Sequence, residues 1–226
     1  MMYQDREKLQ KDILYCIDSG KLLFRGGTAL RLVYGLNRYS EDIDFTNGNR
    51  QFADNIYYQC KIFSKSMKYN ITALENQGQS GKVFYVVIPN TTPKIKVKVE
   101  TSYESTATNF SYEEIEKVKV MSIEEILSEK IRAMIERSEP RDLFDMRYVY
   151  LHFNLSTDVD YLSLINLKMA NSKYRTFNIK DFIRGVESRT KNWYDIEELI
   201  IDETLPDFDE TKDYVIEQTK KLININ

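Results

Sequence analysis

The chain has 226 residues, of which 42% are hydrophobic and 30% are charged, so it can bury a core as one large domain or two small ones. Its formal net charge is −3, which argues against a nucleic-acid binder that relies on overall basicity. A local basic patch remains possible, because binding follows where the charges lie rather than their total.

The first part of the chain alternates between helix and strand patterns. Apolar residues recur at helical spacing from Asp5 to Asp18, and the run KLLF that follows is typical of a short buried strand. This strand leads into Gly26 and Gly27, after which TALRLVYGL predicts a helix with Thr28 as its N-cap and Gly35 at its end. The run EDIDF then predicts a second strand.

A further helix and a β-hairpin are predicted next. Residues 50–69 form an amphipathic pattern, which indicates a helix. Val83–Ile88 is rich in β-branched and aromatic residues, PNTTP is typical of a turn, and Lys94–Glu100 alternates strictly between polar and apolar residues. We therefore predict two antiparallel strands joined by the PNTTP turn.

The pattern changes to helix in the second half of the chain. SIEEILSEKIRAMIER begins with Ser122 and has Glu125 three residues later, which is a capping-box pattern. RDLFDMRYVYLHF predicts a second helix, and residues 155–226 read as helices with polar connections. We therefore predict an α+β protein, with a mixed β-sheet flanked by helices in residues 1–120 and a helical domain in residues 121–226.

Two acidic side chains lie on the predicted strand EDIDF. Because side chains on a strand alternate between its faces, Ile43 and Phe45 should point into a core while Asp42 and Asp44 point together to the other side. Two carboxylates at this spacing can share Mg²⁺, which prefers oxygen ligands and is often held by one or two carboxylates together with substrate phosphates. A solvated acidic face on an edge strand would show the same pattern.

The glycine pair favours the metal interpretation. A strand, two glycines and a helix N-terminus together present backbone N–H groups and the positive end of a helix dipole to an anion. Glycine also lets a phosphate approach the backbone closely. A phosphate-binding turn at Gly26 and Gly27 and a metal site at Asp42 and Asp44 would then be neighbours. A tight turn alone is the alternative for the glycines.

Glu100 is the third acidic candidate. It ends the polar face of the strand that begins at Lys94, and three carboxylates can hold two metal ions that activate a hydroxyl and stabilise a leaving pyrophosphate. Lys94, Lys96 and Lys98 precede it on the same face. These lysines could attract a triphosphate or an RNA backbone, or they could simply face water, as lysines on exposed strands often do.

A lysine occupies the apolar stripe of the helix that begins at Ser122. Lys130 lies four residues after Ile126 and four residues before Met134, and a buried lysine is rare unless it is paired. Its ammonium could contact a phosphate or a carboxylate, or its side chain could reach past the core to water. Asp142 lies on the apolar side of the next helix, so a contact with Lys130 would satisfy both charges, either as a structural pair or as part of an active site.

The remaining composition argues against several other kinds of site. Two cysteines, Cys16 and Cys60, and one histidine, His152, form no CxxC or Cys/His cluster, which disfavours a structural zinc site and a disulfide framework. Reduced thiols in a cytoplasm are the simplest interpretation. No signal peptide and no membrane-spanning stretch is visible, so we expect no membrane partner.

Three segments resemble those of a known family. They are RGGTALRLVYGLNRYSEDIDF, IKVKVE and ILSEKIRAMIERSEPRDLFDMRYV, and they occur in this order within residues 20–150. Together they resemble the AbiEii-type nucleotidyltransferase toxins, which belong to the DNA polymerase β-like nucleotidyltransferase superfamily. The C-terminal helices match only in general character.

The resemblance implies a nucleotidyltransferase-like fold, an NTP substrate, Mg²⁺ as cofactor, and a toxin–antitoxin or phage-defence (abortive infection) pair with a cognate antitoxin. Members related to the mycobacterial MenT toxins transfer nucleotides to the 3′ end of tRNA. The motif residues of the family correspond here to Gly26, Gly27, Ser40, Asp42, Asp44, Lys130, Arg141 and Asp142. Thr28 follows the glycines where many superfamily members have serine, which makes antibiotic-modifying enzymes a poorer match.

These observations predict a phosphate and metal site in the first half of the chain. Asp42 and Asp44 would hold Mg²⁺ on an NTP, and Glu100 would complete the metal site or act as base on the attacking hydroxyl. The NTP phosphates would rest against the glycine turn and its neighbours Gly26, Gly27, Thr28 and Ser40.

The second half is expected to contribute positive charge. Lys130, with Arg38 as a further candidate, would stabilise the departing pyrophosphate, and Asp142 would orient Lys130. The expected reaction is transfer of an NMP to a hydroxyl, with tRNA as the acceptor. Two alternatives stay open: a protein or small-molecule acceptor, and a degenerate binding protein of the same fold.

Overall fold

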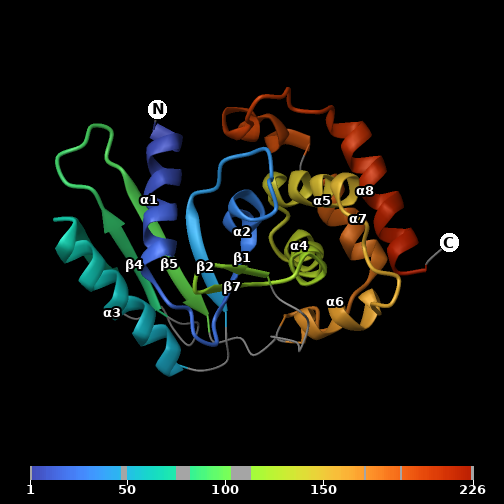
Figure 1. The fold of residues 1–226 in the computed structure, drawn as a ribbon. Coiled ribbons are helices and arrows are strands. Elements are labelled where there is room, and N and C mark those ends of the chain that lie inside the picture. Colours follow the sequence, from blue (N-terminus) through green and yellow to red (C-terminus); the bar gives the residue numbers. More distant parts are fainter. Residues whose placement is uncertain are drawn as a thin grey trace. The chain divides into compact units, whose positions relative to one another are not determined.

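The chain divides into two compact units. A computed structural model describes residues 2–46, 50–74, 82–102, 113–170, 172–188 and 190–224 (Figure 1). One unit comprises Met1–Gly35 and Tyr39–Ser122, and the other comprises Leu36–Arg38 and Ile123–Asn226. The chain therefore enters the second unit for three residues before it returns to the first.

The first unit is built on a mixed sheet, which shows the predicted α+β class. In the described part of the chain the sheet has seven strands, in the order β3-β4-β5-β2-β1-β7-β6. Strand β2 pairs in parallel with β5, β1 pairs in parallel with β7, and the other pairs are antiparallel. The strands are β1 (Leu23–Arg25), β2 (Asp42–Thr46), β3 (Asn70–Leu74), β4 (Lys82–Val87), β5 (Lys96–Ser102), β6 (Glu113–Ile115) and β7 (Val118–Val120).

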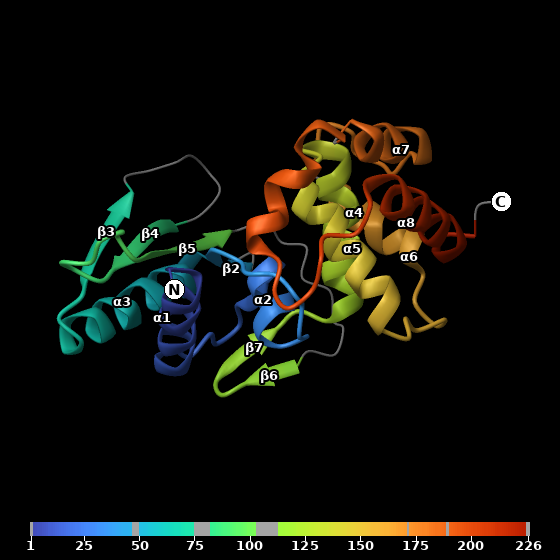
Figure 2. The same cartoon turned by 90° about the horizontal axis from the view of Figure 1, so that it is seen from above.

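Two helices cover one face of this sheet. Helix α1 (Met2–Cys16) contacts β5, and α3 (Arg50–Ser66) contacts β3 and β4, as Figures 1 and 2 show. The strand residues that point to these helices are fully buried, for example Ile43, Phe84 and Val99. Since side chains alternate along each strand, the residues between them lie on the opposite face.

The short helix α2 (Gly26–Leu32) follows β1 and packs on β1 and β2. It begins two residues earlier than the sequence predicts, because Arg25 is the N-cap and Thr28 lies inside the helix. The hydroxyl of Thr28 bonds to the start of β2 instead of capping its own helix. The helix also ends at Leu32, before the predicted end at Gly35, which has a positive φ of 77°.

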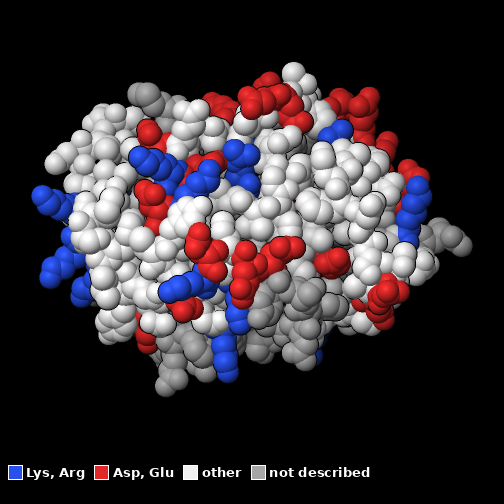
Figure 3. All heavy atoms as spheres, in the orientation of Figure 1, with Lys and Arg blue, Asp and Glu red and all other residues white. Residues whose placement is uncertain are grey.

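The charges of the molecule are unevenly distributed despite the small net charge. On the face shown in Figure 3, basic side chains project from the edge at which α3 lies. Exposed lysines on α3 and shortly after it are Lys61, Lys65 and Lys68, and Lys94 and Lys96 are exposed before and at the start of β5. The net charge of −3 therefore coexists with local basic surface, which the composition alone left open.

The second unit is helical. Helix α4 (Ile123–Glu136) contacts α5 (Pro140–His152), α6 (Tyr161–Met169) and α7 (Ile179–Glu187), as Figure 2 shows. The 3₁₀-helix η2 (Thr190–Leu199) contacts α5, and α8 (Phe208–Leu222) contacts α5 and α7. Of the helices in the described residues, none has the length and apolar character needed to cross a membrane.

Gly185 on α7 packs against the backbone of α4. A methyl group at this position would meet the backbone carbonyl oxygen of Met134 well inside van der Waals contact. A backbone atom in a packed helix cannot move aside cheaply, so we expect Gly185→Ala to destabilise the protein by roughly 3 kcal/mol. Urea unfolding followed by circular dichroism measures this change.

Arg184→Ala on the same helix is the matched control, since the Arg184 side chain is 74% exposed. It should leave the unfolding midpoint nearly unchanged. An equal midpoint for Gly185→Ala and the wild type would show that α4 and α7 do not pack this closely in solution.

Candidate active site

The two acids of β2 lie on the face that α1 and α3 leave uncovered. Asp42 and Asp44 are partly exposed, whereas Ile43 and Phe45 between and after them are fully buried, so the predicted alternation is confirmed. In the parallel pairing with β5, Asp44 stands opposite Glu100. Register therefore brings the three predicted carboxylates to adjacent positions on one face of the sheet.

Gly26 lies directly beside this acidic group. A Cβ at Gly26 would come within 3.1 Å of the Oδ2 atom of Asp44, and the φ of Gly26 is +79°. Both observations require glycine, because any side chain would be strained and would crowd the carboxylate. The first turn of α2 thus lies directly beside the acids of β2.

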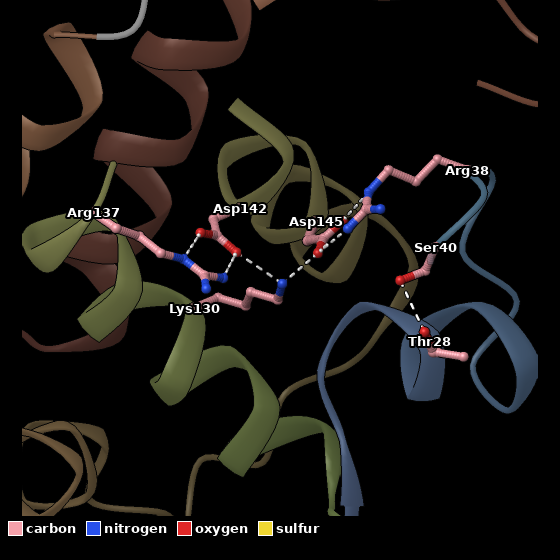
Figure 4. A network of polar contacts seen from close by, with 7 residues as sticks. All are labelled: Thr28, Arg38, Ser40, Lys130, Arg137, Asp142 and Asp145. Carbon is pink, nitrogen blue, oxygen red and sulfur yellow. Dashed lines mark hydrogen bonds and ion pairs between the residues drawn. The ribbon is translucent and has the colours of Figure 1, made fainter. Parts of the chain in front are cut away.

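Thr28 connects α2 to the segment that leads into β2. Its buried hydroxyl lies 2.9 Å from the Oγ atom of Ser40, as Figure 4 shows, and also bonds to the backbone carbonyl of Asp42. Gln10 on α1 donates a hydrogen bond of 2.9 Å to the carbonyl of Ser40. The Thr28 side chain therefore holds Ser40 and Asp42 in place, and any contact of Thr28 with phosphate would involve its backbone.

The surroundings of Asp44 disfavour the ionised form of its carboxyl group. Burial raises the pKa of Asp44 to about 6; the charge of Arg25 opposes this rise, and the charges of Asp42 and Glu100 add to it. Arg25 stands opposite Asp44 on β1. Ionised Asp44 is therefore costly unless a further positive charge comes near it.

Lys98 supplies part of the positive charge. It stands opposite Asp42 on β5, and its Nζ atom lies 2.5 Å from the Oε2 atom of Glu100. Partial burial would lower the pKa of Lys98, but the hydrogen bond to Glu100 and the charges of Glu100, Asp42 and Asp44 outweigh it and raise the pKa. The Glu100 carboxylate is therefore turned toward a lysine.

The residues fit a divalent cation at Asp42 and Asp44. Both supply hard oxygen ligands, and the pKa of Asp44 is raised first by burial and then by the neighbouring carboxylates of Asp42 and Glu100, so a bound cation would favour its ionised form. Within the residues that the structure describes, no group of three or more histidine, cysteine or acidic side chains is arranged to hold a metal ion. A site for Mg²⁺ would thus use two carboxylates of the protein, with further ligands from substrate phosphates and water.

The pKa of Asp44 predicts that metal binding depends on pH. A carboxylic acid must lose its proton to bind Mg²⁺, and Asp44, with a pKa of about 6, is mostly protonated at pH 5 and mostly ionised at pH 7. We expect the affinity for Mn²⁺, used as a probe, to rise about tenfold from pH 5 to pH 7 and to level off above. A calorimetric titration with Mn²⁺ at pH 5, 6, 7 and 8 measures this affinity. Asp44→Asn is the control and should bind weakly at every pH. An equal wild-type affinity at pH 5 and 7 would contradict the assignment of Asp44 as a metal ligand.

A buried ionic network lies in the second unit. The Nζ atom of Lys130 lies 2.8 Å from Oδ1 of Asp142 and 2.6 Å from Oδ2 of Asp145. Arg38 binds both oxygens of Asp145 at 2.6 and 2.7 Å, and Arg137 binds both oxygens of Asp142 at 2.9 and 3.0 Å, as Figure 4 shows. The predicted contact between Lys130 and Asp142 is confirmed.

Burial and ion pairing determine the exposure of Lys130 and the charge of Asp142. Lys130 is 6% exposed, so its side chain does not reach past the core to water. Burial alone would raise the pKa of Asp142, but Lys130 and then Arg137 hold it well below its usual range. Asp142 therefore stays ionised beside Lys130. Arg141, by contrast, lies in the first turn of α5 and is partly exposed.

Arg38 is anchored rather than exposed. Its guanidinium is 2% exposed and engages Asp145, which is fully buried. Next to it, the carbonyl of Asn37 accepts a hydrogen bond of 3.0 Å from the N–H of Ile201, and Arg38 forms an isolated β-bridge with Ile200. These contacts explain why residues 36–38 belong to the second unit, and they mean that a phosphate would compete with Asp145 for Arg38.

The sequence prediction did not assign four of the residues described above, namely Asp145, Lys98, Arg25 and Arg137. Asp145 lies three residues after Asp142 on α5 and is equally buried, so a second acid on the same apolar helix face was the available signal. Lys98 was noted as one of several lysines, without a partner. The prediction that Lys130 and Asp142 act together with Asp42 stays a prediction.

The sequence matches one known protein family over most of its length. Residues 12–214 match the family described as "Nucleotidyl transferase AbiEii toxin, Type IV TA system". The chain belongs to this family. As a member of the AbiEii family it is a nucleotidyltransferase, and the match reaches well beyond the segments that carried the resemblance.

Solved structures share the fold of this AbiEii protein. A crystal structure of a candidate nucleotidyltransferase from H. pylori has 23% sequence identity and a TM-score of 0.64, with 98% of this chain and 95% of that chain covered. JHP933 from Helicobacter pylori has 19% identity and a TM-score of 0.57, with coverage of 98% and 92%. MenT4, a nucleotidyltransferase toxin from Mycobacterium tuberculosis H37Rv, has 14% identity and a TM-score of 0.71, with coverage of 99% and 85%. At these identities the likeness shows the fold, and a comparison with curated proteins returns no significant match.

Proposed function

We propose that the protein is a Mg²⁺-dependent nucleotidyltransferase that transfers an NMP from an NTP to a hydroxyl at the 3′ end of tRNA. In this proposal it acts as the toxin of a toxin–antitoxin or phage-defence (abortive infection) pair, with a cognate antitoxin protein as partner. The observation that carries the proposal is the placement of Asp44 beside Gly26, with Asp42 on the same face of β2 and Glu100 in register on the neighbouring strand. Membership of the AbiEii family supports it.

The first unit would bind the nucleotide and the metal. Asp42 and Asp44 would hold Mg²⁺, which when bound would neutralise phosphate charge at the reacting centre. The NTP phosphates would rest against the first turn of α2, where Gly26 leaves space beside Asp44, and near Ser40. In the transfer, the acceptor oxygen forms a bond to the α-phosphorus. The bond between the α-phosphorus and the oxygen that bridges it to the β-phosphorus breaks, and pyrophosphate leaves. Glu100 would receive the hydroxyl proton.

The ionic network of the second unit would contribute through Lys130. We retain the role of Lys130 in stabilising charge on the departing pyrophosphate, with Asp142 orienting the ammonium at 2.8 Å. Arg38 and Asp145 would then position Lys130, because Asp145 contacts both cations. Arg38 would act on phosphate only through this contact.

An RNA acceptor suits the surface that continues from the acids. Lys96 is exposed on the same face of β5 as Lys98, and its Nζ atom lies 4.9 Å from the centre of the Tyr85 ring. Tyr85 on β4 stands opposite Lys98, which stands opposite Asp42. An aromatic ring and lysines in one row can stack a base and contact a phosphate backbone, and the row ends at the proposed reacting centre. This favours RNA over a protein or small-molecule acceptor.

A cytoplasmic location forms part of the proposal. NTPs and tRNA are available there, and both Cys16 and Cys60 are free thiols. Burial raises the pKa of Cys60 to about 12, so this thiol is not a reactive nucleophile.

The proposal is tested by incubating the purified protein with Mg²⁺, total tRNA and each α-³²P-labelled NTP in turn. We expect label on tRNA from at least one NTP, and loss of that label with EDTA. Label on a protein or a small molecule instead of tRNA would identify that molecule as the acceptor. No label on any acceptor would favour a degenerate binding protein.

A further inference from the structure

The site on the sheet contains a built-in cation. Asp42 and Lys98 face each other across β2 and β5, Asp44 and Glu100 form the next pair, and all four side chains lie on one face. Paired strands are about 4.8 Å apart and alternate residues along a strand about 7 Å apart. The flexible lysine stem therefore brings its ammonium within the electrostatic reach of all three carboxylates.

The charges of this group leave room for one divalent ion. Within the described ranges, three carboxylates at this site interact with two cations, Lys98 and Arg25, because Arg25 also acts on Asp44 through its charge. The group is thus close to neutral before any metal binds, and a single Mg²⁺ would already give it a net positive charge. A second divalent ion needs carboxylates that are free to be shared, and the carboxylate of Glu100 is engaged by Lys98 at 2.5 Å.

We propose that Lys98 takes the place of a second metal ion, so that the enzyme holds one divalent cation at Asp42 and Asp44. This inference rests on the proposed function of the site. The ammonium of Lys98 carries the positive charge on the β5 side, where Tyr85 and Lys96 continue the row proposed for the acceptor. Glu100 then holds Lys98 in position and is not a metal ligand. Of the two roles that the sequence predicted for Glu100, metal ligand or base, only the role as base remains.

The chain provides a matched control for this role. Lys96 lies two residues before Lys98 on the same strand face, but it is exposed and stacks on Tyr85. The side chains of Lys98 and Glu100 are only 28% and 30% exposed. A lysine with no role in the charge balance of the acids can therefore be removed from the same strand for comparison.

The test is a titration of the full-length protein with Mn²⁺ alone, in which electron paramagnetic resonance counts the free ion. Binding that persists in the Asp42→Asn/Asp44→Asn double variant is subtracted as unrelated surface binding. We expect one Mn²⁺ per chain for the wild type and for Lys96→Met. We expect two for Lys98→Met, because Glu100 becomes available, and one again for Lys98→Arg, which keeps the charge.

Glu100→Gln is a second variant that does not depend on the folding of Lys98→Met. If Glu100 is not a ligand, this variant keeps one Mn²⁺ with an affinity within about threefold of the wild type, whereas loss of a carboxylate ligand would weaken binding tenfold or more. Two ions on the wild type, or one ion on folded Lys98→Met, would overturn the role of Lys98 and leave the proposed function intact. No acid-dependent ion on the wild type would instead remove the metal site on which the proposed function rests.

Discussion

Asp42→Asn lowers the rate of nucleotide transfer by about a thousandfold or more while the protein stays folded. The substitution keeps the size of the side chain but removes one of the two negative charges that would hold Mg²⁺. Charge stabilisation by a bound metal ion contributes several kcal/mol, and about 4 kcal/mol corresponds to a thousandfold in rate. Asp42 is partly exposed at the edge of the uncovered face, so its loss should not disturb the core beneath it.

The measurement compares initial rates of label transfer to tRNA for the wild type and the variant at saturating Mg²⁺. Asp54→Asn is the matched control, because Asp54 lies in the same unit, its side chain is 50% exposed, and it forms an ion pair with Lys82 away from the acids of β2 in sequence. Asp54→Asn should transfer at the wild-type rate. A folded Asp42→Asn protein that retains more than a tenth of the wild-type rate would rule out Asp42 as a metal ligand.

The acids of β2 could be predicted because their signal is local. Alternation along a strand is set by backbone geometry, so EDIDF alone determines that Asp42 and Asp44 share a face while Ile43 and Phe45 are buried. The Lys130–Asp142 contact was predictable for a similar reason. A charged residue on the apolar stripe of a helix needs a partner, and the next helix offered a suitable acid.

Other contacts depend on residues far apart in the sequence. Arg38 lies between elements and pairs with Asp145, 107 residues later, so no periodic pattern indicates its burial. The start of α2 was misplaced because Thr28 bonds to β2, a tertiary contact that outweighs its local preference for an N-cap.

The sequence did not predict β3, β6 and β7, because these strands also depend on contacts with other parts of the chain. Strands β6 and β7 have three residues each, and β3 begins at Asn70, shortly after α3 ends at Ser66. Short strands gain their stability from the neighbours they pair with, and β7 pairs with β1 almost one hundred positions away. Lys98 shows the same limit within the site. The alternation of polar and apolar residues reveals the strand face on which Lys98 lies, but side-chain placement decides that it pairs with Glu100 and not with another carboxylate.

Asp145→Ala has the largest expected effect on stability. Asp145 is fully buried and contacts both Arg38 and Lys130, so its removal leaves the guanidinium of Arg38 in the interior without its bidentate partner. Breaking a buried ion pair by removing one member costs about 3–5 kcal/mol, because the remaining charge is neither solvated nor compensated. Lys130 is less affected, since it keeps its contact with Asp142.

Urea unfolding followed by circular dichroism measures the loss, and the double variant Arg38→Met/Asp145→Leu separates its cause. Replacing both members with apolar side chains removes the uncompensated charge, so the double variant should be more stable than Asp145→Ala. Glu217→Ala on α8 serves as the control, because it breaks a fully exposed ion pair with Lys221 and should barely move the unfolding midpoint. If Asp145→Ala unfolds at the same urea concentration as Glu217→Ala, the network is solvated in solution. The anchoring of residues 36–38 must then come from the backbone contacts of Asn37 and Arg38 with Ile201 and Ile200, which follow η2.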